Sequence, residues 1–322
     1  MQKMRSMKQK IVAIAAILII IAGITGVAIW QLSNTPEKPT GPISIIDDVG
    51  RNVTITSYPP ERIVSLSPSC TEILFALGLG DKVVGVDTYS DFPAEETENI
   101  TKVGSFAAIN VEGVLGLEPD LVLATGGIQL TVVEALEEPL RAINGSIVVL
   151  LPKNITGVFE DIKMVGEITG KIDEANALVA DMESRIQEVV DKTEGAPRPN
   201  VYVEYYFNGG YWSFGSEAMI NELIYKAGGI NVFAGFGSKY MSTNDEAIFT
   251  AKPEVIIISK GAMAESCGLT PDVIKARAGW DQLSAVENDR IYEVNEAILV
   301  RPGPRIVDAI EILANLFYPE FD

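Results

Sequence analysis

An internal repeat restricts the folds open to this chain more than any other feature of its sequence. Residues 110–127 (NVEGVLGLEPDLVLATGG) and 244–261 (NDEAIFTAKPEVIIISKG) carry Asn, Glu and Pro at matching places, with a constant offset of 134 residues (244 − 110). Each copy predicts a short helix, a proline-marked turn and a buried strand that leads into a glycine loop. Such units also recur by convergence in α/β proteins, but matches at several positions with one offset favour duplication. We therefore expect two similar α/β lobes, with equivalent residues on equivalent faces.

Short runs rich in Val and Ile accompany both copies and predict further strands. Their apolar character is continuous rather than alternating, which indicates strands buried on both faces, as in a parallel sheet. We expect strands at 62–66, 82–86, 120–124 and 146–150 in the first lobe, and at 200–205, 254–259 and 290–294 in the second. Helices are expected near 71–78, 111–117, 130–141, 217–227, 246–251, 271–277 and 304–317.

Residues 155–192 have a different pattern, with apolar residues at helical spacing along most of their length. Gly157, Gly166 and Gly170 weaken this helix by about 1 kcal/mol each relative to alanine, so we expect a break near Thr169–Gly170. The predicted fold is an α/β protein with two similar parallel-sheet lobes joined by one long helix. Its predicted parts are a signal anchor and tether (1–42), an N-terminal α/β lobe (43–153), the connecting helix (154–194) and a C-terminal α/β lobe (195–322).

The N-terminus indicates the compartment. Basic residues precede the uncharged run 11–30 (IVAIAAILIIIAGITGVAIW), which as a helix would be about 30 Å long and able to cross a bilayer. The run is longer than the apolar core of a cleaved signal peptide, so we favour an uncleaved anchor over a removed peptide. No cysteine lies near residue 30, which excludes a lipoprotein anchor. Residues 31–42 contain three prolines and predict an extended tether, and the basic flank predicts that the rest is extracytoplasmic.

Charge and composition exclude several functions. The formal net charge of −19 argues against nucleic acid or an anionic membrane surface as a partner. The chain has no histidine, which removes the commonest metal ligand and the commonest general base at neutral pH. We therefore expect no catalysis, no metal site and no cofactor. Two cysteines, Cys70 and Cys267, make no disulfide framework, and inert thiols are the simpler interpretation. Sequons that would allow glycosylation begin at Asn52, Asn99, Asn144 and Asn154.

Five motifs carry a resemblance to a known family. They are RIVSLSPSCTEILFALGLGDKVVGVDTYSDFP (62–93), VGSFAAINVEGVLGLEPDLVL (103–123), GSEAMINELIYKAGGINVFAG (215–235), NDEAIFTAKPEVIII (244–258) and RPGPRIVDAIEILA (301–314). With these motifs in order, residues 45–318 resemble the ABC-importer binding proteins for cobalamin and ferric siderophores. The resemblance implies a shallow cleft between the lobes, at the carboxyl ends of the strands, as in open α/β sheets generally. It implies capture of a metal chelate, a corrinoid or a ferric siderophore, and its delivery to an ABC permease and ATPase complex. We expect a monomer.

Loops after predicted strands supply one class of candidate ligand contacts. Ser67 and Pro68 follow the first strand and precede a helix, whose free backbone N–H groups would meet polar edges of the ligand. The same residues would also serve simply to start the helix, either with Ser67 as the cap or with Ser69 and Glu72 in a capping box. Both interpretations remain open from the sequence.

Aromatic residues and one arginine complete the candidate set. The resemblance places two aromatic residues of each lobe on the cleft wall, where their faces would suit a corrin or an aryl-rich chelate; ordinary core packing is the alternative. It also places Arg301 at a cleft position, where it could pair with a carboxylate, phosphate or hydroxamate oxygen. The predicted ligand contacts are Ser67, Pro68, Cys70, Tyr89, Phe106, Gly127, Trp212, Tyr240, Lys260 and Arg301.

Glu112 and Glu246 occupy equivalent places in the two copies of the repeat. In the resembled family, one glutamate per lobe at these motif positions docks onto arginines of the membrane permease, so we expect the same role here. The alternative is that both are ordinary solvated glutamates, which contribute almost nothing to stability.

Three other functions compete with ligand delivery. A protein of the same fold that binds a bare metal ion is disfavoured, because such sites usually combine histidines with carboxylates. A sensory or adhesive ectodomain on a membrane anchor remains open. An enzyme is disfavoured because the sequence shows no nucleophile–base pair and no phosphate-binding loop.

Overall fold

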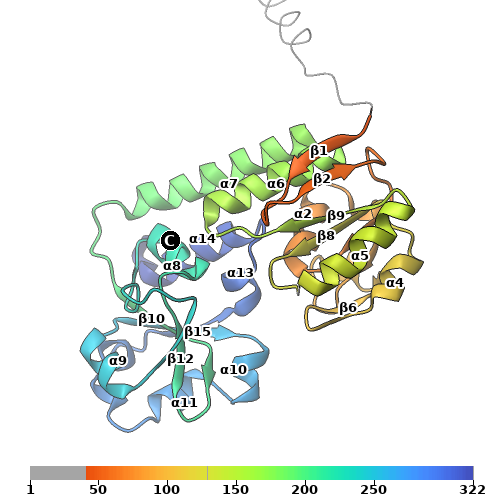
Figure 1. The fold of residues 1–322 in the computed structure, drawn as a ribbon. Coiled ribbons are helices and arrows are strands. Elements are labelled where there is room, and N and C mark those ends of the chain that lie inside the picture. The colour runs from red at the N-terminus through yellow and green to blue at the C-terminus, as the bar shows by residue number, and fades with distance from the viewer. Residues whose placement is uncertain (1–40, 129, 322) are drawn as a thin grey trace, which may run out of the picture. The chain divides into compact units, whose positions relative to one another are not determined.

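Two parallel sheets organise the structure, as the sequence predicts. The computed structural model describes residues 41–128 and 130–321. The N-terminal lobe contains a sheet of order β5-β4-β3-β8-β9, and the C-terminal lobe contains one of order β13-β10-β15-β16 (Figure 1). The strands of the first sheet are β3 (Ile63–Ser65), β4 (Val83–Val86), β5 (Thr101–Lys102), β8 (Leu121–Thr125) and β9 (Ser146–Leu150). Those of the second are β10 (Asn200–Glu204), β13 (Ile230–Asn231), β15 (Val255–Lys260) and β16 (Ile291–Asn295).

The repeat appears in the structure as equivalent strands and equivalent helix caps. Strands β8 and β15 occupy corresponding places in their sheets, and each pairs in parallel with both of its neighbours. The helices before them, α4 (Val111–Gly116) and α9 (Asp245–Ala251), begin in the same way. Asn110 Oδ1 accepts a hydrogen bond from Gly113 N, and Asn244 Oδ1 accepts one from Ala247 N. Capping asparagines satisfy N–H groups that the helix itself leaves open.

The turn between helix and strand is also repeated. Glu118 and Lys252 both have left-handed backbone, with φ of 47° and 48°. Two residues later, the carboxylates of Asp120 and Glu254 accept hydrogen bonds from main-chain N–H groups next to or at the start of the neighbouring strand. Both lobes therefore reproduce one local design, which explains why the match in sequence extends beyond apolar residues.

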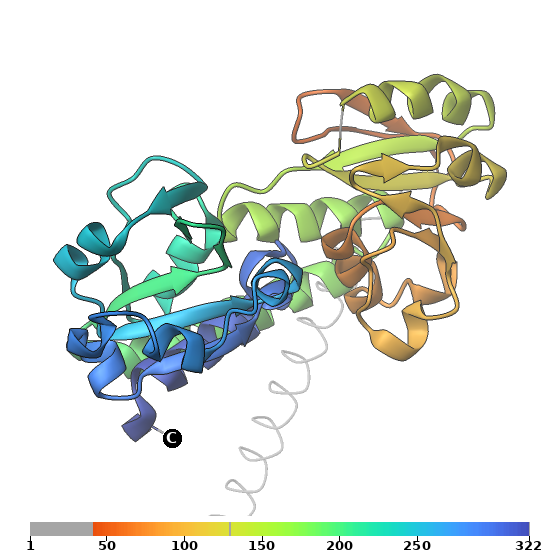
Figure 2. The ribbon, with the colours of Figure 1, turned by 90° about the horizontal axis from the view of Figure 1, so that it is seen from below.

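The predicted connecting segment consists of two helices, α6 (Ile155–Thr169) and α7 (Ile172–Thr193). The predicted break lies where α6 ends, at Gly170 in left-handed conformation with φ of 73°. A Cβ atom on Gly166 would lie 2.4 Å from the Cβ of Ala175, so this glycine allows the two helices to pack closely. Helix α7, of 22 residues, is the long helix that runs along both lobes (Figures 1 and 2).

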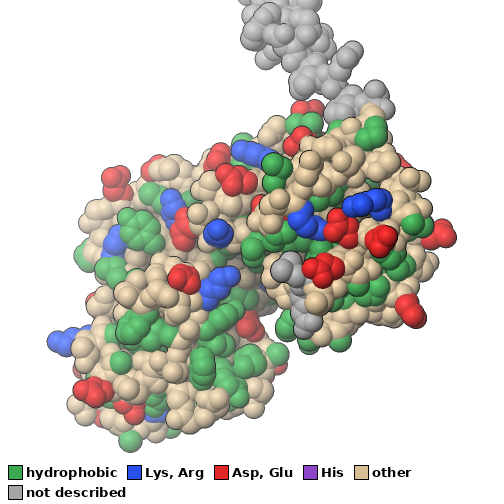
Figure 3. Space-filling view, viewed as in Figure 1, with side chains coloured by type: hydrophobic (Ala, Val, Ile, Leu, Met, Phe, Trp, Pro, Cys, Tyr) green, Lys and Arg blue, Asp and Glu red, His purple; other side chains and the backbone are tan. Residues whose placement is uncertain are grey.

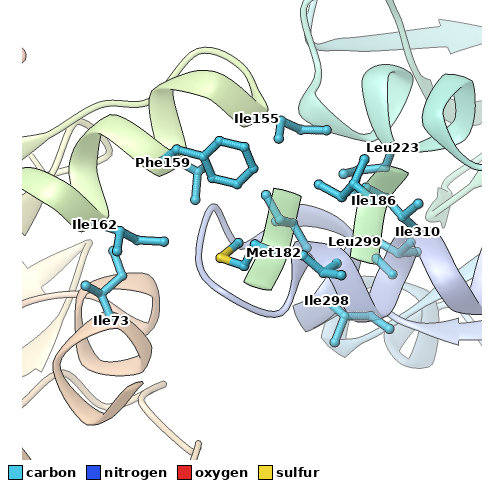
Figure 4. Packing of buried hydrophobic residues seen from close by; sticks show 14 of the residues in the cluster. Ile73, Ile155, Phe159, Ile162, Met182, Ile186, Leu223, Ile298, Leu299 and Ile310 are labelled. Carbon is cyan, nitrogen blue, oxygen red and sulfur yellow. The ribbon is translucent and has the colours of Figure 1, made fainter. Parts of the chain in front are cut away.

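One hydrophobic core runs through both lobes by way of these helices. The largest buried cluster includes strand residues of both sheets, for example Ile63 and Val255, together with residues of α6 and α7. Figure 4 shows members of this cluster from both lobes, including Ile73 of the N-terminal lobe, Ile162 and Met182 of the connecting helices, and Ile310 of the C-terminal lobe. Because protein cores are close-packed and resist deformation, this continuous core permits only small changes in the angle between the lobes.

Other helices cover the sheets, and several small antiparallel elements were not predicted. The remaining helices are α2 (Pro68–Ala76), α3 (Ala94–Thr97), α5 (Leu130–Ala142), α8 (Met219–Lys226), α10 (Ala262–Ser266), α11 (Pro271–Lys275), α12 (Ser284–Glu287), α13 (Glu296–Val300) and α14 (Ile306–Phe317). The antiparallel elements are the pair β1 (Ile43–Ile46) and β2 (Asn52–Ile55), the pair β6 (Gly104–Ser105) and β7 (Ala108–Ile109), and the sheet of β11 (Tyr206–Phe207), β12 (Tyr211–Phe214) and β14 (Tyr240–Thr243).

The predicted anchor at residues 11–30 lies outside the described residues. Among the residues that are described, no helix is both long enough and apolar enough to cross a membrane.

Candidate ligand-binding cleft

A cleft of about 960 Å³ opens between the two lobes. Its walls include residues just beyond the carboxyl ends of β3, β4, β8 and β9 on one side and of β15 and β16 on the other. Figure 3 shows the groove, with hydrophobic side chains along the C-terminal lobe beside it. This is the place where ligands bind in open α/β sheets, because the loops that follow parallel strands gather at one edge.

The structure brings most of the predicted contact residues together on the walls of this cleft. Those that line it are Ser67, Pro68, Tyr89, Phe106, Gly127, Tyr240, Lys260 and Arg301. They come from both lobes, so a ligand in the cleft would touch both at once.

Cys70 and Trp212 do not line the cleft, and their predicted place there was wrong. Cys70 is fully buried in the core under α2, where burial raises the pKa of its thiol to about 12. The sequence could not distinguish the loop-facing from the core-facing residues of a helix in which Ser69 to Leu74 are all buried. Trp212 lies on β12, where its indole Nε1 donates to Asn208 Oδ1 at 3.0 Å.

Helix α2 uses the first of the two predicted caps. Ser67 is the N-cap residue, its Oγ accepts from Cys70 N at 3.3 Å, and Pro68 follows at the first helical position. The capping box of Ser69 and Glu72 does not form, because the Glu72 carboxylate points instead to arginines of the C-terminal lobe. Ser67 therefore contributes to the helix start and also borders the cleft.

Half-exposed aromatic rings face the cleft from both lobes. Tyr89 and Phe106 are 53% and 58% exposed and lie with ring centroids 6.3 Å apart. On the other wall, Tyr240 is 55% exposed and packs against Tyr205 and Phe214, with both centroid distances at 5.6 Å. Exposed aromatic surface is costly unless something covers it, so these rings provide apolar contact area for a bound molecule.

An ion-pair network joins the lobes at the cleft. Arg305 donates two hydrogen bonds to the buried carboxylate of Glu72, through Nε at 3.0 Å and Nη2 at 2.5 Å. Arg301 Nη1 lies 2.6 Å from Asp91 Oδ1 and 3.4 Å from Glu72 Oε1, and Nη2 donates to the carbonyl of Tyr89. Burial alone would raise the pKa of Asp91, but the hydrogen bond and charge of Arg301 outweigh it and lower that pKa. Arg301 thus borders the cleft, but its guanidinium already donates hydrogen bonds to acceptors within the protein.

The cleft also contains charged residues that the sequence patterns did not single out. Besides Asp87 and Asp91, they are Lys153, Glu217, Lys239, Glu265 and Glu296. Lys153 and Lys239 lie in loops outside the quoted motifs. Glu296 was the most accessible to prediction, because it stands two residues after the predicted strand 290–294.

Glu296 lines the cleft from the C-terminal lobe. A Cβ atom on Gly261 would lie 1.7 Å from Glu296 Oε2, so the repeat glycine is required here to make room for this carboxyl. Burial raises the pKa of Glu296, although the charge of Arg301 acts in the opposite direction. Lys260, at the mouth, pairs with Glu293 at 2.8 Å.

The two predicted docking glutamates lie outside the cleft. Glu112 and Glu246 are exposed in the first turns of α4 and α9, which lie at opposite ends of the two-lobed unit (Figure 1). No group of three or more Cys, Asp or Glu residues able to hold a metal ion occurs in the described part of the chain.

Comparison with known proteins identifies this architecture. The family model described as periplasmic binding protein matches residues 63–297, which include both sheets and most of the cleft. The chain belongs to the periplasmic binding protein family. Membership confirms the predicted fold and the predicted class of function, an extracytoplasmic solute-binding protein of the ABC importer type.

Individual relatives agree with this assignment. The chain is 32% identical to an uncharacterized ABC transporter substrate-binding lipoprotein of Bacillus subtilis, over 87% of this chain and 86% of that protein. It is 30% identical to a vitamin B12-binding protein of Vibrio cholerae, over 79% of this chain and 88% of that one. The solved structure of a periplasmic heme-binding protein from Roseiflexus sp. RS-1 is similar with a TM-score of 0.71 and 28% identity, covering 81% and 99% of the two chains. These relatives are named as binding proteins rather than enzymes.

Proposed function

We propose that the protein binds a corrinoid in the cleft and delivers it to a membrane permease. The aromatic rings on both walls carry this proposal, because flat rings from two sides suit a broad macrocycle with large apolar faces. The volume of about 960 Å³ is near the upper end for small-molecule pockets. Two relatives that are 30% and 31% identical to this chain, from Vibrio cholerae and Halobacterium salinarum, are named vitamin B12-binding protein and cobalamin-binding protein.

Binding would be reversible and would change the shape of the protein little. The ligand would lie between Tyr89 and Phe106 on one wall and Tyr240 on the other, with Ser67 and Pro68 at the start of α2 beneath it. The continuous core and the Arg301 and Arg305 ion pairs oppose wide opening, so ligand would enter an almost preformed site. A preformed site loses less conformational entropy when it binds.

Delivery would depend on Glu112 and Glu246. Both are exposed, one on each lobe, and would pair with arginines of the permease. The charge balance of the chain, 44 acidic against 25 basic residues, would steer it toward a basic docking surface. The predicted N-terminal anchor would keep the protein at the membrane, where its encounters with the permease are frequent.

Calorimetric titration with cyanocobalamin, hemin and ferrichrome tests the ligand. We expect saturable binding of cyanocobalamin at micromolar or lower Kd, and a loss of about tenfold or more in Tyr240→Ala, from the removed ring contact. Tyr225→Ala is the matched control, since Tyr225 is equally exposed on α8 but does not line the cleft. Stronger binding of hemin or ferrichrome would reassign the ligand. If none of the three compounds bound, the proposal of a metal-chelate ligand would be refuted.

Uptake of labelled cyanocobalamin by cells tests the docking role. The double variant Glu112→Arg, Glu246→Arg should lose uptake and keep its affinity for the ligand. The control Glu183→Arg, Glu188→Arg makes the same change of charge at exposed positions on α7 and should transport normally. Normal uptake by the first variant would refute the docking assignment.

A further inference from the structure

In each lobe, a cleft aromatic and an exposed glutamate belong to one duplicated segment. Phe106 stands six residues before Glu112 (112 − 106), and Tyr240 stands six residues before Glu246 (246 − 240). The two aromatic residues are themselves separated by the repeat offset of 134 (240 − 106). The repeat therefore extends four residues upstream of the capping asparagines, to side chains that line the cleft. We call residues 106–112 and 240–246 the two arms.

The N-terminal arm is held against the strand ends of its lobe. Phe106 lies at the tip of the β6–β7 hairpin, where Ser105 pairs with Ala108. The hairpin packs tightly at Gly104, which has φ of 101° and whose added Cβ would lie 2.2 Å from the carbonyl oxygen of Ala108. Thr88 N donates to the carbonyl of Gly104 at 2.7 Å, which fixes the hairpin to the loop after β4.

The C-terminal arm is fixed at both ends. Strand β14 begins at Tyr240 and pairs with β12 through four residues, from Tyr240 opposite Phe214 to Thr243 opposite Tyr211. Helix α9 begins immediately afterwards. Its first residue, Asp245, accepts hydrogen bonds through Oδ1 from Tyr211 Oη and from Trp280 Nε1, both at 2.8 Å.

Neither arm contains a residue that would let it flex. The sequences FAAINVE and YMSTNDE have no glycine and no proline between the aromatic and the glutamate, and glycine is the residue that most increases backbone freedom. In both arms an asparagine side chain caps the helix that carries the glutamate. A force on the ring therefore reaches the helix through short paired strands rather than through a free loop.

We infer that the arms report ligand occupancy to the docking helices: a ligand packed on Phe106 and Tyr240 orders α4 and α9, and thereby fixes Glu112 and Glu246 for the permease. This inference rests on the proposed function, because it needs a ligand on these two rings. It adds a route by which loaded and empty protein differ at the docking surface without wide closure of the lobes. Binding that reduces local motion changes a distant affinity in this way.

Amide hydrogen exchange on the full chain in detergent, with and without cyanocobalamin, tests the inference. We expect the ligand to slow exchange several-fold in α4 and α9, as well as in the cleft segments 67–69 and 260–263. Helix α11, a capped surface helix of five residues that no arm joins to the cleft, should not change. Protection of the cleft loops without protection of α4 and α9 would overturn the inference and leave the proposed ligand intact. Protection nowhere would overturn both.

The variant Tyr211→Phe separates transmission from simple stability. Tyr211 does not line the cleft, so ligand affinity should remain, while loss of its hydrogen bond to Asp245 should reduce the ligand-induced protection of α9 and leave that of α4 unchanged. A purely structural role would speed exchange in α9 equally with and without ligand, and that result would contradict the inference. Tyr225→Phe, the matched control on α8, should alter neither helix.

Discussion

Replacing Asp161 by asparagine should stabilise the protein at neutral pH, although it removes an ionisable residue. Asp161 lies on α6, is 1% exposed, and its Oδ2 has no hydrogen-bond partner in the described structure. Burial raises the pKa of this carboxyl to about 9, with smaller contributions from its hydrogen bond to Asp48 and from the charges of Asp48 and Glu160. The folded protein therefore keeps a proton on Asp161, which donates to the Asp48 carboxylate. Asp48 Oδ2 in turn accepts from Leu151 N at 2.5 Å, at the point where the chain leaves β9.

The size of the effect follows from proton linkage. The pKa of this group is raised in the folded state above its unfolded value of 3.8, so its contribution to stability is full below pH 4 and is lost as the pH rises toward 9. Each pH unit above the unfolded pKa costs about 1.4 kcal/mol, which amounts to about 4 kcal/mol at pH 7. An asparagine needs no proton, and its amide can still donate to Asp48. Asp161→Asn should therefore gain up to about 4 kcal/mol over wild type at pH 7 and almost nothing at pH 4.

Urea unfolding of wild type and Asp161→Asn at pH 4, 5.5, 7 and 8.5 measures this difference. The gap in unfolding free energy should widen steadily with pH. Asp281→Asn, an exposed aspartate in the C-terminal lobe, is the control and should track wild type throughout. A gap that is independent of pH would show that Asp161 is ionised in the folded state and would refute the reasoning.

Three further outcomes are expected. A thiol reagent should modify only Cys267 in the folded protein and Cys70 as well in denaturant, because the pKa of the buried Cys70 thiol is about 12; rapid reaction of both would contradict the burial of Cys70. Glu204→Gln should lower the urea-unfolding free energy by about 3–5 kcal/mol, since the fully buried carboxylate pairs with Arg277 at 2.6 and 2.7 Å; a change below 1 kcal/mol would count against the pair. Met182→Ala should cost about 2–5 kcal/mol at its buried place between the lobes, and an unchanged midpoint would argue against a continuous core.

The strands of the parallel sheets were the most predictable part of the fold. Continuous Val and Ile runs such as 254–259 identified the central strands, because strands buried on both faces appear in the sequence as unbroken runs of apolar β-branched residues. The β11–β12 hairpin was missed, although Asn208-Gly209-Gly210 between two aromatic runs is a hairpin signal. Trp212 in this segment was interpreted as a ligand contact, and no strand was predicted between residues 205 and 254.

The cleft was predictable where the repeat or the resemblance marked a loop, and not where a contact joins distant residues. Arg301 was placed correctly at the cleft, but its partner Asp91 lies 210 residues away in the chain, and no local pattern reveals such a pair. The direction of a side chain on a short element was equally hidden. Trp212 and its neighbours alternate between the two sides of β12, and the sequence alone does not say which side faces the ligand.

The continuous core has a consequence for how the molecule comes apart. If each lobe had its own sealed interior, a fragment ending at Lys153 would be a complete globule. Here such a fragment would expose Ile73 to water, and the remainder would expose Ile162, because these two residues lie against each other in the shared core. Neither half of the duplicated design is self-sufficient, so we expect both to melt together in one cooperative transition. Duplication produced two sheets, but we expect the two lobes to fold as a single unit.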